Sequence, residues 1–543
     1  MKAFFRKMTG TVALVIALAI PLTACGGGNK DTAETTAKTE ETVTDDTTET
    51  AGDPSTEETT VETATGEPKM GGEVVLAVAQ EPDSLDPYLA AAAGTKEIIY
   101  NFYEGLVKLM PDSTFEDCLS TSHEVSEDGL EYIFQIREGV KFHNGEEMGP
   151  ADVVYSLRRG AGLDSADGTP LIGELGIIDT IEEVEGENAV KITLSEPDAD
   201  FITYLTAAII PEGYEDQAKQ PIGTGPFVFD SYETQQHVKM VRFDDYWRER
   251  PAYLDSVIFR IVPSADSAMV DLQAGKIDIF PYLTMDKADL VADKYDFIES
   301  DSNMVQLWAL NSDRAPFDDV RVRQAMDMAV DKQMLLDGIT FGQGTILESG
   351  MAPSMGEFYN KTVNETRKYD PEQARALLAD AGYNDDLTIT ITVPGNYVIH
   401  VQTAEMIAAM LAEVGVTADI QSVDWGTWLN NVYEGRDYDS TVIALTFDYC
   451  APSTVLGRYS STASNNFVNF NSAEYDSIYA ETQTEQDHAK RVADYQRLQD
   501  ILSEEAASVF LQNPGVQTAV SKELGGYTTY PMYVQDMYNV YFK

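Results

Sequence analysis

The side chains most often used for chemistry are scarce in this chain and widely spaced. The chain holds three cysteines and five histidines, which are His123, His143, His237, His400 and His488. The histidines never fall at the short spacing of a metal-binding motif, and HExxH, GxSxG, CxxC and Walker-type loops do not occur. The usual signatures of a hydrolase, a redox enzyme and a nucleotide-binding protein are therefore missing. We expect no catalytic activity, no metal and no cofactor.

The first 24 residues have the order of a secretory signal peptide. Three basic residues open the chain, residues 12–20 form an uncharged apolar run, and small residues follow up to Cys25. The run is too short for a membrane span, which takes about 20 residues. Residues 22–26 resemble the lipobox of bacterial lipoproteins, in which cleavage before the cysteine is coupled to diacylation of its thiol. The resemblance implies a signal peptide over 1–24 and a lipidated Cys25, and an ordinary signal peptide with an incidental cysteine is the alternative.

A polar segment follows the predicted lipidation site. Residues 30–69 hold twelve acidic residues against three lysines, with no aromatic residue and almost no large aliphatic one. Such a segment cannot bury enough apolar surface to offset its chain entropy. We therefore expect residues 25–69 to form a lipidated cysteine and a disordered acidic tether.

The remaining body, residues 70–543, is long and strongly acidic. It is too long for one hydrophobic core, so two or three domains are expected. Removing the tether (−9) and the basic start (+3) from the chain total of −54 leaves about −48 on the body. This charge disfavours nucleic acid and an anionic membrane face as partners.

Hydrophobic periodicity in the body predicts an α/β protein. Strands are predicted near residues 71–78, 130–136, 139–142, 189–194, 227–232 and 257–262. In the second half, helix, glycine and strand alternate, with helices predicted over 371–381, 403–414 and 487–508 and strands over 387–393 and 416–423. This alternation is typical of α/β crossover units.

Several ordered segments of the body resemble one known family. They are Tyr132–Gly145, Ala151–Ser156, Ile222–Phe227, Tyr246-Trp247, Leu272–Asp278, Pro316–Ala325 and Tyr369–Pro371. Together they resemble the extracytoplasmic solute-binding proteins of ABC importers, in the oligopeptide/dipeptide/nickel cluster (solute-binding family 5) and its lipoprotein type. The match is closest to the oligopeptide-binding branch.

The resemblance implies a periplasmic-binding-protein-like fold of two lobes with a hinge and an extra, β-rich inserted domain. Domain I would combine residues 70–112, 216–303 and 510–543, domain II would be 113–215, and domain III would be 304–509. The two crossings between the lobes would lie near residues 303–310 and 509–514. Such paired crossings let two lobes close on a ligand.

The segment Leu445–Pro452 resembles the peptide-clamp region of this family. In its peptide-binding members an aspartate pairs with the α-ammonium of the ligand, and Asp448 is the matching residue. A buried ammonium needs such a carboxylate because its desolvation is otherwise too costly. A turn-capping role for Asp448 is the alternative. The chain departs from the pattern at residues 444–445, which replace Gly-Trp, and at Val442, where some members carry a basic residue.

Four further residues are weaker candidates for contact with the ligand. Tyr449 and Cys450 follow Asp448 directly, Trp308 lies at the expected hinge, and Trp425 follows a predicted strand. Indole rings at a domain boundary often face a ligand, but a place in the core is the simpler account for both tryptophans and for Cys450.

The predicted protein is a non-enzymatic, lipid-anchored binding component of an ABC importer that captures oligopeptides. Its partners would be a peptide, the permease with its ATPase and the membrane, the last through the lipid anchor only. We expect a monomer outside the cytoplasm, at the cell surface or in the periplasm, and no nucleic acid. The alternatives are nickel chelates or oligosaccharides as ligand, an extracellular peptide-sensing receptor, and an extracellular hydrolase that kept a binding-protein fold.

Overall fold

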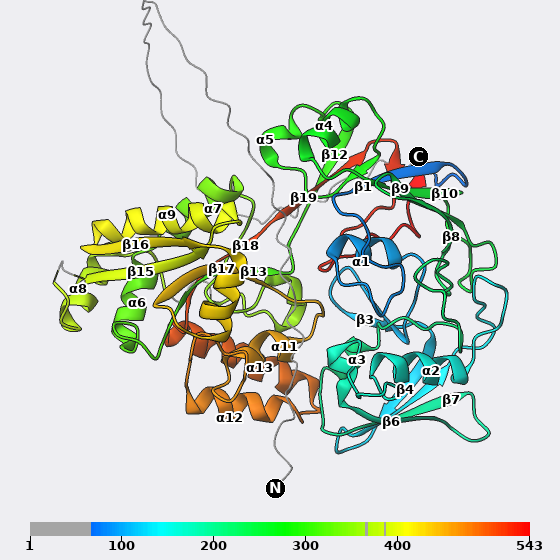
Figure 1. The fold of residues 1–543 in the computed structure, drawn as a ribbon, viewed down its shortest axis with the longest axis horizontal. Helices are drawn as coiled ribbons and strands as arrows, with labels where there is room; N and C mark the ends of the chain where they lie inside the picture. The colour runs from blue at the N-terminus through cyan, green and yellow to red at the C-terminus, as the bar shows by residue number, and fades with distance from the viewer. Residues whose placement is uncertain (1–66, 364–366, 385–386) are drawn as a thin grey trace, which may run out of the picture.

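The computed structural model describes residues 67–363, 367–384 and 387–543. The predicted signal peptide, Cys25 and nearly all of the predicted tether lie outside the described residues. Within the described ranges, no helix is both long and apolar enough to cross a membrane. Three large β-sheets with helices packed on them make up this part of the chain (Figure 1).

A seven-stranded mixed sheet, in the order β12-β19-β11-β1-β10-β9-β8, forms the first lobe. Val74, Leu76 and Val78 of the central strand β1 are buried in the same cluster as Ile98 of helix α1. Ala77, on the opposite face, packs in a second cluster with Leu272 of α4. The strands are β1 (Glu73–Val78), β8 (Phe227–Glu233), β9 (His237–Arg242), β10 (Ser256–Ile261), β11 (Ile279–Phe280), β12 (Tyr295–Ser300) and β19 (Val516–Ser521), and the helices are α1 (Ala93–Ile99), α4 (Ala265–Gln273) and α5 (Met285–Ala288).

A four-stranded antiparallel sheet, in the order β4-β5-β7-β6, forms an insert in the first lobe. Helix α2 begins at Pro150, and the Asp152 carboxylate accepts a hydrogen bond from Gly149 N at 2.9 Å. The strand predicted over residues 139–142 is wrong: only Lys141 makes an isolated bridge there, to Glu147. The elements are β4 (Ser120–Val125), β5 (Glu131–Ile136), β6 (Ile178–Glu183), β7 (Ala189–Leu194), α2 (Pro150–Gly160) and α3 (Phe201–Tyr204), preceded by β2 (Val107–Leu109) and β3 (Phe115–Asp117).

A six-stranded mixed sheet, in the order β14-β18-β13-β17-β15-β16, forms the second lobe. One face of the sheet packs on α6, α8 and α9, and the other packs on α11, α12 and α13. Helix α9 begins five residues before the predicted start at 403. The strands are β13 (Met304–Leu310), β14 (Gly344–Ile346), β15 (Leu387–Pro394), β16 (Val416–Val423), β17 (Ser440–Thr446) and β18 (Val509–Pro514), and the helices are α6 (Val320–Met328), α7 (Lys332–Thr340), α8 (Pro371–Asp380), α9 (Val398–Glu413), α10 (Trp425–Thr427), α11 (Pro452–Leu456), α12 (Ala473–Thr482) and α13 (His488–Glu504).

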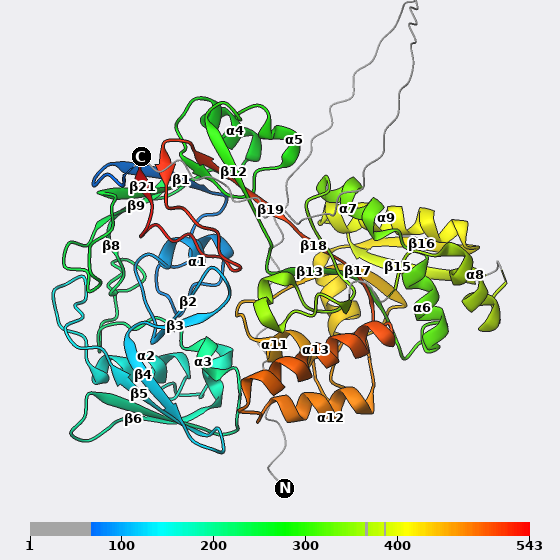
Figure 2. The ribbon, with the colours of Figure 1, turned by 180° about the vertical axis from the view of Figure 1, so that it is seen from behind.

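Two short crossings join the lobes and form a hinge, which both views show between the two halves of the molecule (Figures 1 and 2). Residues 301–303 connect β12 to β13, and Gly515 connects β18 to β19. The predicted boundary between residues 509 and 510 falls inside β18, which pairs with β13 and β14 and so belongs to the second lobe. The chain changes sheets only after Pro514.

The Gly-Thr-Gly-Pro motif at residues 223–226 packs against the segment that follows α1. A Cβ on Gly223 would lie 2.2 Å from the carbonyl oxygen of Phe102, and one on Gly225 would lie 2.5 Å from that of Asn101. Glycine is required here because two backbone segments approach each other closely. The motif therefore fixes the position of the segment after α1, which lines the cleft described next.

Candidate functional site

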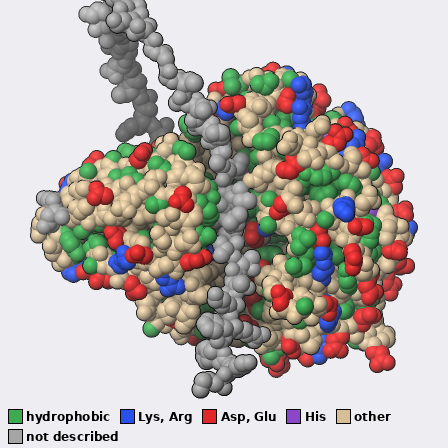
Figure 3. Space-filling view, in the orientation of Figure 1, with side chains coloured by type: hydrophobic (Ala, Val, Ile, Leu, Met, Phe, Trp, Pro, Cys, Tyr) green, Lys and Arg blue, Asp and Glu red, His purple; other side chains and the backbone are tan. Residues whose placement is uncertain are grey.

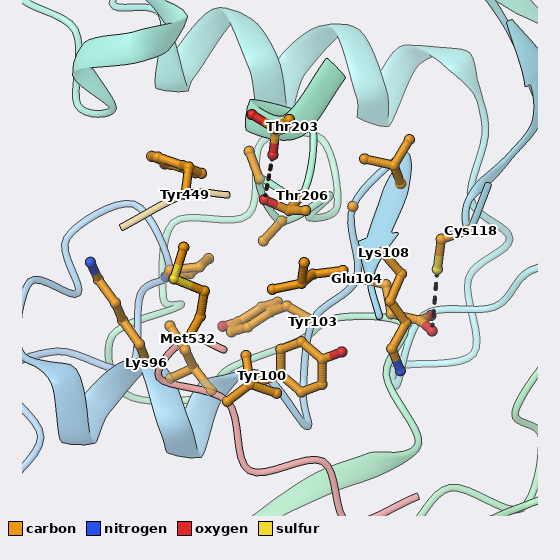
Figure 4. A pocket seen from close by; sticks show the side chains of 18 of the residues that line it. Lys96, Tyr100, Tyr103, Glu104, Lys108, Cys118, Thr203, Thr206, Tyr449 and Met532 are labelled. Carbon is orange, nitrogen blue, oxygen red and sulfur yellow. Dashed lines mark hydrogen bonds between the residues drawn. The ribbon is translucent and has the colours of Figure 1, made fainter. Parts of the chain in front are cut away.

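A cavity of about 220 Å³ lies between the lobes. Residues of the first lobe, the insert and the second lobe all line it (Figure 4). The first lobe contributes α1 and the segment after it, the insert contributes Thr203 and Thr206, and the second lobe contributes residues 448–450. Pockets at such interfaces are common ligand sites because movement of either wall opens and closes them.

The loop that carries Asp448 extends from the buried strand β17 to the start of α11 at Pro452. The side chain of Asn303, in the hinge, donates a hydrogen bond to the carbonyl oxygen of Phe447 at 2.8 Å. On the other side of Asp448, Ala451 is completely buried in the hydrophobic core of the insert. The carboxylate is thus held on a loop that is anchored both at the hinge and against the opposite lobe.

Asp448 forms an ion pair across the cleft. Its Oδ1 lies 3.0 Å from Nζ of Lys96 on α1, and about one third of each side chain is exposed (32% for Lys96 and 35% for Asp448). In Figure 4 the Lys96 side chain extends from α1 toward the side of the cavity where Tyr449 lies. An ammonium group therefore already occupies the position in front of the predicted ligand-binding carboxylate.

Tyr449 and Cys450 both line this cavity. The Tyr449 ring packs edge-to-face on Tyr204 of the insert, with 5.2 Å between ring centroids. Burial raises the pKa of the Cys450 thiol to about 12 and also raises that of Cys118, so both thiols stay protonated at neutral pH. Both cysteines are free.

The cavity wall opposite Asp448 holds a second carboxylate, Glu104. It accepts hydrogen bonds from Tyr246 Oη and Trp247 Nε1, each at 2.7 Å, and from Thr224 Oγ1 at 3.0 Å. Cys118 Sγ lies 3.6 Å from its Oε1, as the dashed line in Figure 4 shows. Neutral donors therefore satisfy this buried side chain.

A buried ion pair lies in the same wall of the cavity. Lys108 Nζ lies 3.2 Å from Asp536 Oδ2, and the ammonium also lies over the ring of Tyr100. The Lys108 ammonium lowers the pKa of Asp536 against the opposing effect of burial, and the Asp536 carboxylate raises the pKa of Lys108. Both lysines of the cavity are therefore already paired with carboxylates.

A second cavity of about 320 Å³ lies at the hinge, and the two cavities share Met532, Tyr533 and Val534. Its walls come from both crossings, from the start of α9 and from residues 527–535. Among the described residues that line it, Asp301 is the only carboxylate and none is a lysine or arginine. This cavity is therefore aromatic and polar but nearly uncharged.

His400 lines the hinge cavity as a neutral imidazole. Burial lowers its pKa to about 4. The Thr403 hydroxyl donates to Ile399 O and so accepts from Gln306 Nε2, which also lies 3.3 Å from His400 Nδ1. Nδ1 is then the acceptor and Nε2 carries the proton. In the described part of the chain, Nε2 has no hydrogen-bond partner.

The two predicted tryptophans lie apart from these cavities. Trp308 is completely buried in the core of the second lobe, where its ring packs edge-to-face on Phe317. Its side chain lies on the face of β13 that packs on α6, α8 and α9, so Trp308 is a core residue in this structure and not a wall of the cleft. Trp425 stacks on Trp428 with 5.1 Å between ring centroids and lines neither cavity.

The lobes also touch away from the hinge, where α3 lies beside α11 and α13 (Figures 1 and 2). Asp200 Oδ2 accepts a hydrogen bond from Ser453 N at 2.8 Å, and Arg491 donates to the carbonyl oxygen of Ala199 at 2.6 Å.

Within the described ranges, no group of three or more histidine, cysteine, aspartate or glutamate side chains is placed to hold a metal ion.

Sequence reasoning missed most of the charged residues of the site. Lys96, Glu104, Lys108 and Asp536 were not singled out, because charged side chains are usually solvated. Lys108 and Asp536 are 428 residues apart, and no local pattern indicates that they meet.

Comparisons with known proteins agree with this architecture. The family described as "Bacterial extracellular solute-binding proteins, family 5 Middle" matches residues 114–467. Heme-binding protein A of Haemophilus influenzae is 30% identical over 477 residues, which cover 81% of this chain and 86% of that protein. The dipeptide-binding protein of Escherichia coli is 28% identical over 498 residues, which cover 83% and 91%.

The fold matches that of solved binding proteins. The oligopeptide-binding protein AppA of Bacillus subtilis, solved in complex with a nonapeptide, superposes with a TM-score of 0.69 and 23% identity, over 88% of this chain and 100% of that one. The predicted fold, a mixed α/β periplasmic-binding-protein architecture, is therefore confirmed. The chain belongs to family 5 of the bacterial extracellular solute-binding proteins, the non-catalytic substrate-binding components of ABC importers.

Proposed function

We propose that this protein is the oligopeptide-binding component of its importer and that Asp448 pairs with the α-ammonium of the peptide. One observation carries this proposal. The Asp448 carboxylate lies in an interlobe cavity and already has a primary ammonium, that of Lys96, 3.0 Å away. The position in front of Asp448 therefore accommodates the same chemical group that a peptide presents at its amino terminus.

The charges of the cleft favour recognition of one end of the peptide only. Lys96 and Lys108, the lysines of the first cavity, are both paired, and the described lining of the hinge cavity holds neither lysine nor arginine. Val442, where a basic residue stands in some relatives, is completely buried in the core. A peptide carboxylate would find no unpaired cation here. We therefore expect peptides of different length to bind with their carboxyl ends held by neutral groups or by water.

The names of relatives point to several ligands, and the cleft discriminates among them. A heme brings two propionates, which need cationic partners, and the cavity linings offer no unpaired cation. A bare metal ion needs a group of ligating side chains, which the described residues do not provide. A peptide supplies the ammonium that Asp448 fits, and its backbone amides suit the hydroxyl and amide groups of the hinge cavity.

The anchoring of the protein is proposed from the sequence. Cys25, in its lipobox-like context, would carry the lipid, and residues 26–69 would connect the lipid to the folded body outside the cytoplasm. Cys25→Ser should move the protein from the detergent phase to the aqueous phase in a Triton X-114 partition, whereas Cys450→Ser should not.

Calorimetric titration tests the ligand class. We expect trialanine to bind the purified protein and N-acetyl-trialanine, which lacks the ammonium, to bind much more weakly. Hemin serves as the competing ligand, and native mass spectrometry of freshly purified protein would identify peptides retained from the cell. Binding of hemin without binding of trialanine, or equal affinity for the free and acetylated peptides, would refute the proposal.

A further inference from the structure

The Lys96–Asp448 ion pair connects the two lobes at the site where a ligand would bind. Lys96 belongs to α1 of the first lobe, and Asp448 follows β17 of the second. Both residues line the same cavity, and their charged atoms are 3.0 Å apart. Within the described residues, Lys96 is the only cationic side chain that makes an ion pair with this carboxylate.

We propose that Lys96 is an internal substitute for the ligand's ammonium, which an incoming peptide must displace before it can bind Asp448. Lys96 then sets the affinity of the protein and holds the empty lobes together. This inference rests on the proposed recognition of a peptide ammonium by Asp448. Lys96 would compete with the ligand for Asp448, and the ligand-free protein would have a contact between the lobes that the complex lacks.

The displaced Lys96 has a second carboxylate close by. Glu174 of the insert interacts electrostatically with both Lys96 and Asp448, and burial raises its pKa while Lys96 lowers it. When a peptide ammonium pairs with Asp448, the Lys96 ammonium still interacts electrostatically with Glu174. The exchange therefore avoids leaving a cation without a carboxylate in the cavity.

The exposure of the pair predicts the size of the effect. About one third of each side chain remains exposed, so the ion pair is weakened by solvent, and such pairs contribute modestly. Loss of Lys96 removes an interaction present only in the empty protein. Peptide affinity should therefore rise, by about 1.4- to 5-fold, which corresponds to the usual range of exposed ion pairs.

Calorimetry with trialanine and N-acetyl-trialanine tests this exchange. Lys96→Met should bind trialanine about 1.4- to 5-fold more tightly than the parent protein and should bind N-acetyl-trialanine with unchanged affinity. Lys239→Met is the matched control, because Lys239 makes an ion pair of similar exposure with Glu73 inside the first lobe. It should leave both affinities unchanged. In an Asp448→Asn background, Lys96→Met should have no effect.

A conformational measurement keeps this inference separate from the peptide proposal. Spin labels at the exposed Val270 of the first lobe and Met334 of the second report the distance between lobes without any ligand. Lys96→Met should lengthen or broaden this distance distribution, and Lys239→Met should not. If trialanine does not bind the parent protein, the peptide proposal fails and this distance alone decides the role of Lys96. An unchanged distribution, or weaker trialanine binding by Lys96→Met, would overturn the inference.

Discussion

The cleft contains two adjoining cavities that differ in charge. The interlobe cavity holds two ion pairs, Lys96–Asp448 and Lys108–Asp536, together with the carboxylate of Glu104. The hinge cavity is larger, and its described lining holds tyrosines, amides and hydroxyls with Asp301 as its only carboxylate. Residues 532–534 line both cavities and separate them.

This difference divides recognition between the two cavities. A fixed carboxylate in the interlobe cavity can select a ligand by a single charged group, because an unpaired ammonium is costly to bury. Neutral groups in the hinge cavity can bond to peptide amides without selecting a charge. In Figure 3 the acidic side chains gather mainly on the right half of the molecule, which is the first lobe with its insert, and are sparser on the second lobe.

The largest expected effect comes from the buried ion pair of the interlobe cavity. Asp536→Asn leaves the Lys108 ammonium buried without a carboxylate, and breaking such a pair costs about 3–5 kcal/mol of stability. Urea unfolding should therefore show a large loss. Asp245→Asn, which breaks the exposed pair of Asp245 with Lys141, is the control and should change stability little. A small loss for both would show that the charges of this cavity are not structural.

The next effect concerns affinity and tests charge recognition directly. Asp448→Asn keeps the shape of the side chain but removes its charge, and a hydrogen bond to a charged group contributes about 1.5–3 kcal/mol. Trialanine should therefore bind about 10- to 100-fold more weakly in calorimetry. N-acetyl-trialanine should bind with the affinity seen for the parent protein. An equal loss for both peptides would make Asp448 a structural residue.

The hinge cavity should make stability depend on pH through His400. Its folded-state pKa of about 4 lies below the ordinary value of 6.5, so the unfolded chain binds more protons between these values. Stability should fall as the pH drops from 6.5 to 4, and His400 should account for up to about 3 kcal/mol of the loss.

Urea unfolding at pH 7 and pH 4.5 measures this contribution. His400→Gln should reduce the difference in the free energy of unfolding between the two pH values. His488→Gln, which changes an exposed histidine, serves as the control. Asp198, whose pKa burial raises to about 6, acts in the opposite direction, so Asp198→Asn should enlarge the difference. If His400→Gln leaves the difference unchanged, His400 is not held neutral in this cavity.

The smallest effect is expected at Cys450. Burial raises the pKa of its thiol to about 12, so little thiolate forms below that pH. The folded protein should show no reaction of Cys450 with Ellman's reagent at pH 8, and the thiol should react after unfolding. Cys450→Ala should change trialanine affinity little. Fast reaction in the folded state would mean that this wall of the cavity opens readily to solvent.

The sequence predicted regular elements well where the pattern was local. The start of α8 at Pro371 and the strand over Ala189–Leu194 agree with the structure, because a proline at the first helical position and strict alternation are strong local signals. Residues 139–142 failed as a strand because a run of four residues carries too little pattern.

The reasons behind motifs were harder to predict than the motifs themselves. Gly223 and Gly225 were noticed in the sequence, but the neighbour that requires them, the backbone of residues 101–102, is more than 100 residues away. Trp308 was expected near the ligand because it lies in β13, close to the hinge. The pleat of β13 decides which face each side chain takes, and Trp308 lies on the face covered by α6, α8 and α9.

The family, the α/β class and the choice of Asp448 could be inferred from the sequence, since each depends on patterns within short segments. The tertiary structure alone decided what the Asp448 carboxylate contacts and which cavity it lines. Lys96 and Asp448 lie in different lobes and hundreds of residues apart. Their pairing follows from how the hinge places two separately folded sheets, and a pairing between lobes leaves no trace in local sequence.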